Sequence, residues 1–66
     1  MTPAEEIREL LEQYGQTVYD LAEETGVKAS TIIQRLETGL LPSKEYTRYA
    51  RAILHRANRR GEEEPL

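Results

Sequence analysis

Apolar residues recur at intervals of three or four through most of this chain, a spacing typical of amphipathic helices. Thr2, followed by proline, alanine and glutamate, predicts the start of a first helix, because its hydroxyl can accept from the backbone N–H three residues later. The apolar pattern of this helix stops near Gly15. Thr17 and Asp20 repeat the capping arrangement and predict a short second helix, which Gly26 ends.

Two further helices are expected in the second half of the chain. The third covers about residues 28–38, where Gly39 stops it, and the fourth is capped by Ser43 and reaches about residue 59 or 60, with Gly61 at its end. Their inner faces are expected to be Ala29, Ile32, Ile33 and Leu36 in the third helix and Tyr46, Tyr49, Ala50, Ile53, Leu54 and Ala57 in the fourth.

These segments predict an all-α fold, a compact four-helix domain over residues 1–60 followed by a disordered acidic tail over residues 61–66. The length of 66 residues suffices for one small domain. A domain of this size buries only about 60% of the surface that its unfolded chain exposes. Most of the apolar residues, 38% of the chain, must therefore lie in one core, and few remain to line a substrate pocket.

The composition excludes several kinds of site. There is no cysteine, which rules out disulfides and thiolate metal sites, and the one histidine, His55, belongs to no cluster with ligand spacing. We therefore expect no metal and no cofactor. Scattered carboxylates and one histidine supply neither an acid–base pair nor a nucleophile with its base, so we expect a protein that is not an enzyme and has no small-molecule substrate.

Targeting signals are absent from the sequence pattern. No apolar run approaches the roughly 18 residues of a membrane span, and none follows Met1 as in a signal peptide. We expect no membrane contact and a cytoplasmic location, unless the protein is designed and location does not apply. Design is a hypothesis, because well-capped helices, Glu- and Arg-rich surfaces and the absence of cysteine, tryptophan and phenylalanine are habits of computational design.

Charge is distributed unevenly along the chain. Residues 1–26 carry seven acidic side chains against Arg8, whereas residues 27–60 carry eight basic side chains against two acidic ones. A split of this kind suggests an anionic partner for the second half. The overall net charge of -3 argues in the opposite direction.

One spacing within the second and third helices is specific to a known motif. Ala22 is a small residue where two helices can cross closely, and Gly26, four positions later, can take the turn conformation. Val27 and Ile32 then supply apolar side chains that lock the two helices together. The pattern predicts a helix-turn-helix over residues 17–38.

This segment resembles the helix-turn-helix of bacterial and phage repressors. Residues 17–27 look close to the opening of the lac repressor headpiece, and Leu36-Glu37-Thr38-Gly39 with the later Pro42-Ser43 is similar to the lambda repressor and Cro group. The resemblance covers about residues 16–54 and implies a lambda repressor-like domain. In such domains the second helix of the motif lies in the major groove of double-stranded DNA, and the flanking segments hold phosphates.

Carried over by position, the resemblance implies two sets of contacts. Gln34 has the chemistry for a bidentate pair with adenine, and Arg35 can reach a guanine or a phosphate. The base-contacting set is expected to be Ser30, Thr31, Gln34, Arg35 and Thr38. The phosphate-contacting set is expected to be Thr17, Tyr19, Lys28, Ser43, Lys44 and Arg48.

The chain departs from the repressor pattern around Arg35. One residue more than the lambda-type pattern stands between Ile32 and Leu36, and Arg35 occupies a position where these repressors bury an apolar side chain. The third helix is therefore expected to be rotated about its axis or extended. Lys28 stands where a serine often caps the recognition helix, and a nearby phosphate would explain this choice.

Several alternatives remain open at this point. The polar face of the third helix could be a solvated surface, and the chain could be a protein-interaction module or a stable scaffold. Exposed Leu40 and Leu41 would best support a protein contact, and the alternative is that they cap the core beneath the loop. The fourth-helix residues Arg51, His55 and Arg59 are expected to be solubilising or paired with the acidic first helix. We expect a monomer, with a homodimer left open, because no heptad or separate dimerisation segment is visible.

Overall fold

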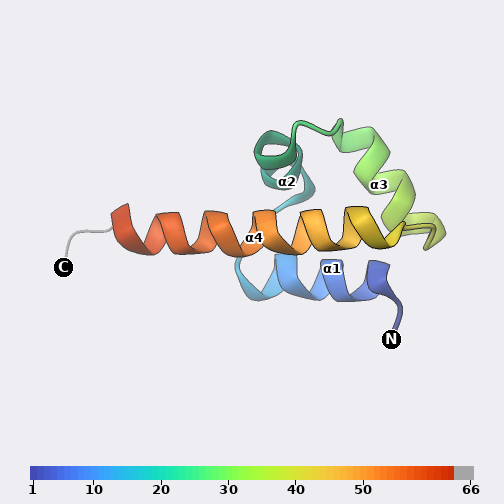
Figure 1. The fold of residues 1–66 in the computed structure, drawn as a ribbon, viewed down its shortest axis with the longest axis horizontal. Helices are drawn as coiled ribbons and strands as arrows, with labels where there is room; N and C mark the ends of the chain where they lie inside the picture. The colour runs from blue at the N-terminus through green and yellow to red at the C-terminus, as the bar shows by residue number, and fades with distance from the viewer. Residues whose placement is uncertain (64–66) are drawn as a thin grey trace.

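The computed structural model describes the backbone of residues 1–63 and the side chains of residues 1–59, and this part of the chain is helical and contains no strand. The longest helix, α4, runs through the molecule, with α1 along one side and α2 and α3 across the other (Figure 1). None of the described helices combines the length and the apolar character needed to cross a membrane. The helices are α1 (Pro3–Gln13), α2 (Val18–Thr25), α3 (Ala29–Thr38) and α4 (Ser43–Glu63). The prediction of an all-α, four-helix domain is therefore confirmed.

The first two helices begin as their capping residues predict. Thr2 Oγ1 accepts from the Glu5 N–H at 3.2 Å, and Pro3 is the first helical residue. Thr17 and Asp20 form a reciprocal capping box, in which the Thr17 N–H donates to Asp20 Oδ2 at 2.9 Å and the Asp20 N–H donates to Thr17 Oγ1 at 3.3 Å. Two donors that the start of α2 would leave unpaired are thereby satisfied.

Both ends of α4 differ from the prediction. The helix begins at Ser43 itself, and the Tyr46 N–H donates to the Pro42 carbonyl at 2.9 Å, so Ser43 lies within the first turn rather than before it. At the other end Gly61 does not stop the helix, which continues to Glu63. Glycine lowers helix stability without forbidding the conformation, and the helical pattern before it can therefore propagate through. Of the predicted tail, residues 61–63 are helical and residues 64–66 lie outside the described residues.

All four helices and the segment before α4 contribute to a single apolar core. The largest fully buried side chains are Ile7, Leu21, Ile32, Tyr49 and Ile53. The remaining buried apolar residues are Ala4, Leu11, Leu36 and Leu41.

Two apolar residues lie elsewhere than predicted, and one of two alternatives is decided for a third. Ile33 is half-buried and Leu54 is 43% exposed, because each lies about 100° around its helix from a buried isoleucine and so falls at the edge of the inner face. In the segment before α4, Leu40 is exposed as expected but Leu41 is buried. Leu41 therefore closes the core beneath this loop and is not available as a surface contact.

Candidate functional site

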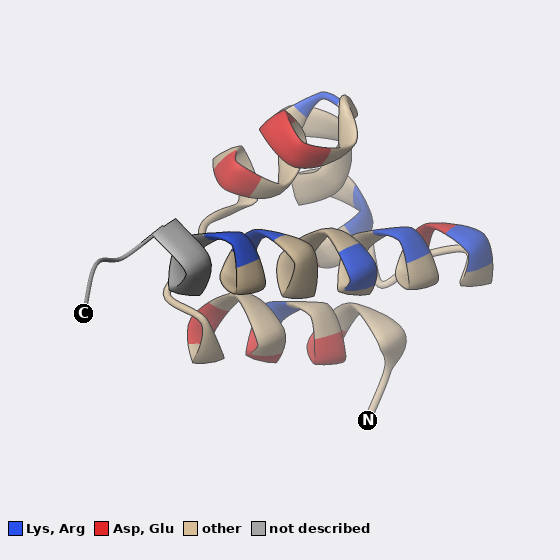
Figure 2. Ribbon diagram, turned by 60° about the vertical axis from the view of Figure 1, so that its left-hand side comes forward, with Lys and Arg blue, Asp and Glu red and all other residues tan. Residues whose placement is uncertain are grey.

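Acidic and basic side chains occupy different parts of the fold. Asp and Glu lie along α1 and α2, whereas Lys and Arg follow one another along α4 (Figure 2). The α3 helix lies between these regions of charge in the sequence and carries mostly neutral polar side chains on its outward side. Its surface is therefore the place where short polar side chains, rather than charges, are concentrated.

The turn between α2 and α3 consists of residues 26–28 and fixes how α3 is presented. Gly26 adopts a left-handed conformation (φ 78°), which an L side chain rarely takes, and its N–H donates to the Ala22 carbonyl at 2.8 Å. The Val27 N–H donates to Thr25 Oγ1 at 3.2 Å, and the Val27 side chain packs against the core. Hydrogen bonds and packing together hold the start of α3 in a defined position.

The outward side of α3 is built opposite two buried anchors. Ile32 and Leu36 face the core, and Gln34 lies on the far side of the helix from both. Ser30 and Gln34 are exposed, and their side chains have no hydrogen-bond partner among the described residues. Both are therefore free to donate to or accept from a ligand. Thr31, which is also in the predicted base-contacting set, is half-buried on the same helix.

Thr38, at the end of the same helix, is already engaged. Its hydroxyl donates to the Gln34 carbonyl at 2.8 Å and accepts from the Leu40 N–H at 3.3 Å. These bonds help α3 end at Gly39, which is left-handed (φ 76°). The Thr38 hydroxyl therefore has no free donor for a base.

Arg35 lies on the flank of α3 that faces α4. Its Nη1 donates to Tyr49 Oη at 2.6 Å and to Glu45 Oε2 at 3.2 Å. The hydrogen bond to the tyrosine, with a smaller contribution from the Glu45 carboxylate, raises the pKa of Arg35 above its ordinary value. In this position the guanidinium is bonded to α4 and is not free on the outward side of α3. The polar end of the arginine meets polar partners on α4, which accounts for an arginine on this flank of the helix.

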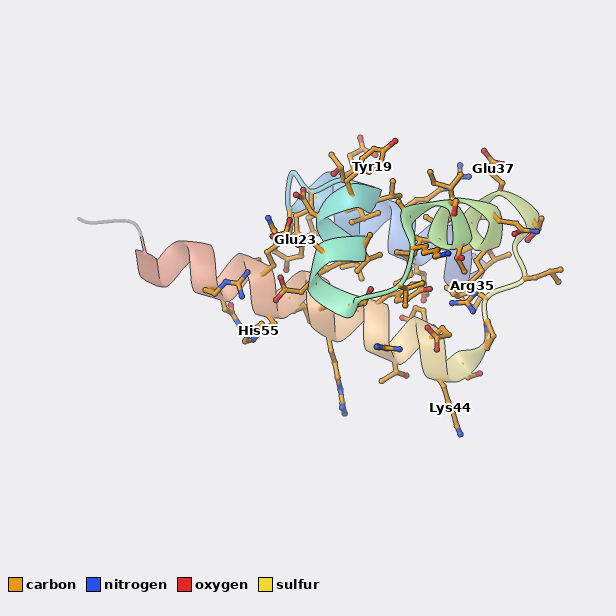
Figure 3. The ribbon with its side chains drawn as sticks, turned by 90° about the horizontal axis from the view of Figure 1, so that it is seen from above. Tyr19, Glu23, Arg35, Glu37, Lys44 and His55 are labelled. Atoms are coloured by element: carbon orange, nitrogen blue, oxygen red, sulfur yellow. The ribbon has the colours of Figure 1, made fainter. Side chains whose placement is uncertain are left out.

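The predicted phosphate-contacting residues flank α3 on two sides. Tyr19 is 68% exposed and points outward from α2, and Lys44 projects from the first turn of α4 on the opposite side of the molecule, with α3 between them (Figure 3). Lys28 precedes α3, is exposed and forms no capping hydrogen bond with its side chain. These three side chains can therefore reach a ligand that lies across α3.

The other three predicted phosphate-contacting residues are less free. The side chain of Thr17 belongs to the capping box of α2. Arg48 is exposed, and its Nη2 donates to the Thr25 carbonyl at 2.7 Å, which ties α4 to the end of α2. Ser43 is exposed in the first turn of α4. Of the three, Ser43 alone has its side chain unengaged among the described residues.

Sequence analysis did not single out Glu37, which is exposed on the outward side of α3. The helical period could have revealed it, since Glu37 follows Gln34 by three residues and Ser30 by seven. A carboxylate there repels phosphate but can accept a hydrogen bond from the amino group of cytosine. Glu37 therefore belongs with any description of this surface.

A cluster of ion pairs joins α2 to the second half of α4. Arg59 donates to both Glu24 carboxylate oxygens at 3.0 and 3.2 Å, Arg56 Nη1 pairs with Glu24 at 3.3 Å, and Arg56 Nη2 pairs with Asp20 at 3.3 Å. His55 lies 3.9 Å from the same glutamate. The sequence predicts Arg51, His55 and Arg59 to be solubilising or paired with the first helix. Arg51 is exposed, whereas the partner of His55 and Arg59 is Glu24 on α2 and not a residue of α1. We name this cluster of Asp20, Glu24, His55, Arg56 and Arg59 the α2–α4 clasp.

Among the residues that the structure describes, no group of three or more His, Cys, Asp or Glu side chains could hold a metal ion. No protein family, no curated protein and no solved structure matches this chain. The site is therefore interpreted from its own geometry and chemistry.

Proposed function

We propose that this protein binds double-stranded DNA in a sequence-specific manner, with α2, the turn and α3 acting as a helix-turn-helix of the repressor type and α3 entering the major groove. The observation that carries the proposal is the outward side of α3, where Ser30 and Gln34 are exposed, unengaged and rigidly supported by the core. The major groove of B-DNA admits an α-helix, and a glutamine amide can form a bidentate pair with adenine. A serine hydroxyl can serve as donor or acceptor to either base of a pair.

Residue choice within the chain supports this surface as a binding site. Serine and threonine are poorer helix formers than the Glu, Arg and Lys that occupy most other exposed helical positions here. Their use on the outward side of α3 lowers helix stability without contributing to the core. A hydrogen-bonding role toward a ligand explains that choice better than solvation does.

Phosphate contacts are proposed on both sides of α3. Lys28 places a cation at the positive end of the α3 dipole, an arrangement that is unfavourable until an anion binds. A phosphate there would pair with the lysine and accept from the free N–H groups of the first turn. At the start of α4, Lys44 supplies a cation and Ser43 a hydroxyl that can bind a second phosphate. Tyr19 can contact the DNA backbone from α2. Thr17 and Arg48 would bind phosphate only through side chains that already form hydrogen bonds within the protein, Thr17 in the capping box and Arg48 with the Thr25 carbonyl.

The base-reading set is proposed to comprise Ser30, Thr31 and Gln34. Thr38 lacks a free donor, and the guanidinium of Arg35 is bonded to α4, so both are left out of this set. We propose a monomer that reads a short site of about five or six base pairs, from the reach of one recognition helix and its side chains.

A second candidate is a protein-interaction module. It is favoured by Leu40, which is 76% exposed in the segment that follows α3, and by the acidic net charge of -3. The two candidates differ in their response to salt. Affinity that depends on several phosphates falls steeply between about 50 and 200 mM salt, whereas an apolar contact around Leu40 would hardly change.

The test is selection from a randomised duplex DNA pool on immobilised protein at low salt. We expect enrichment of one short motif, and loss of the bound DNA when the salt is raised to about 200 mM. Gln34→Ala, selected in parallel, should enrich a motif that has lost its preference at one position. Retention no better than that of an unrelated acidic protein would refute DNA binding and leave the interaction module in its place.

A further inference from the structure

Arg35 joins α3 to α4 through a single nitrogen. Its Nη1 donates to Tyr49 Oη at 2.6 Å and to Glu45 Oε2 at 3.2 Å, two acceptors that lie one helical turn apart on α4. Figure 3 shows Arg35 on the flank of α3, away from the side on which Tyr19 projects. The guanidinium therefore links the flank of α3 to two positions one turn apart near the start of α4.

Both acceptors are themselves held in place. Tyr49 is fully buried, and its hydroxyl has Arg35 as its hydrogen-bond donor. The side chain of Glu45 is 22% exposed, so it is partly screened from water by the protein around it. An arginine bonded to a buried tyrosine and a partly buried carboxylate fixes the flank of α3 against a defined turn of α4.

The charge of Glu45 gives this contact a second consequence. Glu45 is the acidic residue in the first turn of α4, directly after Ser43 and Lys44, where a phosphate contact is proposed. An uncompensated carboxylate at that point would repel a phosphate. Arg35 supplies the opposite charge at 3.2 Å and makes the pair neutral overall.

We infer that Arg35 is a positioning residue for DNA binding, which acts through Glu45 by neutralising its carboxylate beside the proposed phosphate contact at the start of α4. It does not read a base. This inference rests on the proposed function, because charge compensation at Glu45 matters here only if DNA lies beside the start of α4.

The test uses Arg35→Gln, Glu45→Gln and the double variant in the full chain. Each is titrated at low salt with the duplex enriched by the wild type and with a scrambled duplex of equal length. Arg35→Gln should weaken binding to both duplexes by a similar factor, about three- to tenfold, because one carboxylate is left uncompensated near the phosphate. Glu45→Gln should strengthen binding to both duplexes by a similar factor, and the double variant should return to within about twofold of the wild type.

Base reading and charge compensation predict opposite results in the double variant. A double variant that stays as weak as Arg35→Gln, or a selection in which Arg35→Gln loses its preference at one base position, would overturn the inference. Circular dichroism shows whether each variant is folded. If Arg35→Gln is not folded, Glu45→Gln alone decides, since unchanged or weaker binding by that variant contradicts charge compensation. Failure of the wild type to bind any duplex would instead remove the proposed function itself.

Discussion

At the scale of single residues, the two sides of α3 explain why Gln34 is the most informative position. Ile32 and Leu36 are buried, and Gln34 lies on the opposite side, exposed and unengaged among the described residues. This arrangement was predictable, because the helical period alone separates the two sides. The partners of Arg35 were not predictable, since they depend on where α3 crosses α4 and on a tyrosine 14 residues away.

Gln34→Ala should therefore change sequence preference rather than overall affinity for DNA. Loss of a bidentate amide pair reduces discrimination at one base pair by about 1–3 kcal/mol and leaves phosphate contacts in place. The measurement is binding to a panel of duplexes that vary at each position of the enriched motif. Gln13→Ala, an exposed glutamine at the end of α1, is the matched control and should leave the panel unchanged. A Gln34→Ala panel identical to that of the wild type would remove this residue from the base-reading set.

Substitution of two adjacent isoleucines tests which side of α3 faces the core. Ile32 is fully buried in the core, whereas Ile33 is half-buried at the edge of the inner face of α3. Ile32→Ala should lower the free energy of unfolding by about 2–4 kcal/mol, because it removes core contacts and leaves a cavity. Ile33→Ala should cost about 1 kcal/mol or less, since a partly exposed side chain loses less buried surface. Equal losses in urea denaturation would contradict the orientation of α3 described above.

At the scale of helices, local signals and long-range contacts were predictable to different degrees. The start of α2 follows from Thr17 and Asp20, three residues apart, because the capping box is a local arrangement. The α2–α4 clasp involves Glu24 and residues more than 30 positions later, so its partners depend on the packing of the whole domain. The same holds for Gln16, which is buried and donates from Nε2 to the Ile53 carbonyl at 3.0 Å.

Removing the central charge of the α2–α4 clasp should destabilise the fold. Glu24 has a side chain only 12% exposed and accepts from two arginines, so Glu24→Gln should lower the free energy of unfolding by about 1–3 kcal/mol. The neighbouring Glu23→Gln is the matched control, since Glu23 is exposed and has no partner among the described residues. Urea denaturation of both variants checks this. If both lose the same small amount, the clasp contributes little to the attachment of α2.

At the scale of the whole molecule, the separation of charge reconciles the proposed DNA-binding surface with the acidic net charge of the protein. The acidic side chains gather on α1 and α2, and basic side chains lie along α4, whose start adjoins α3 (Figure 2). The location of the charges therefore indicates better than the net charge which surface can bind an anionic partner. The charge asymmetry was predictable from the sequence, but the side of the fold on which each basic residue lies required the arrangement of the helices.

Lys44 and Arg8 separate a local phosphate contact from a general effect of charge. Lys44→Ala should weaken binding to all duplexes alike and lower the slope of log affinity against log salt by about one, because one phosphate contact is lost. Arg8→Ala removes the same charge from the exposed surface of α1 and should leave the slope nearly unchanged. Fluorescence anisotropy between about 50 and 200 mM salt measures both slopes. Equal slopes of log affinity against log salt for the two variants would contradict a phosphate contact at the start of α4.

The most direct test of DNA binding through α3 is a titration of ¹⁵N-labelled protein with the enriched duplex, followed by amide chemical shifts. We expect the largest changes at Ser30 and Gln34 of α3, at Lys28 before it, and at the first residues of α4. Shifts concentrated on α1 or on the second half of α4, with the amides of α3 unmoved, would contradict DNA binding through α3.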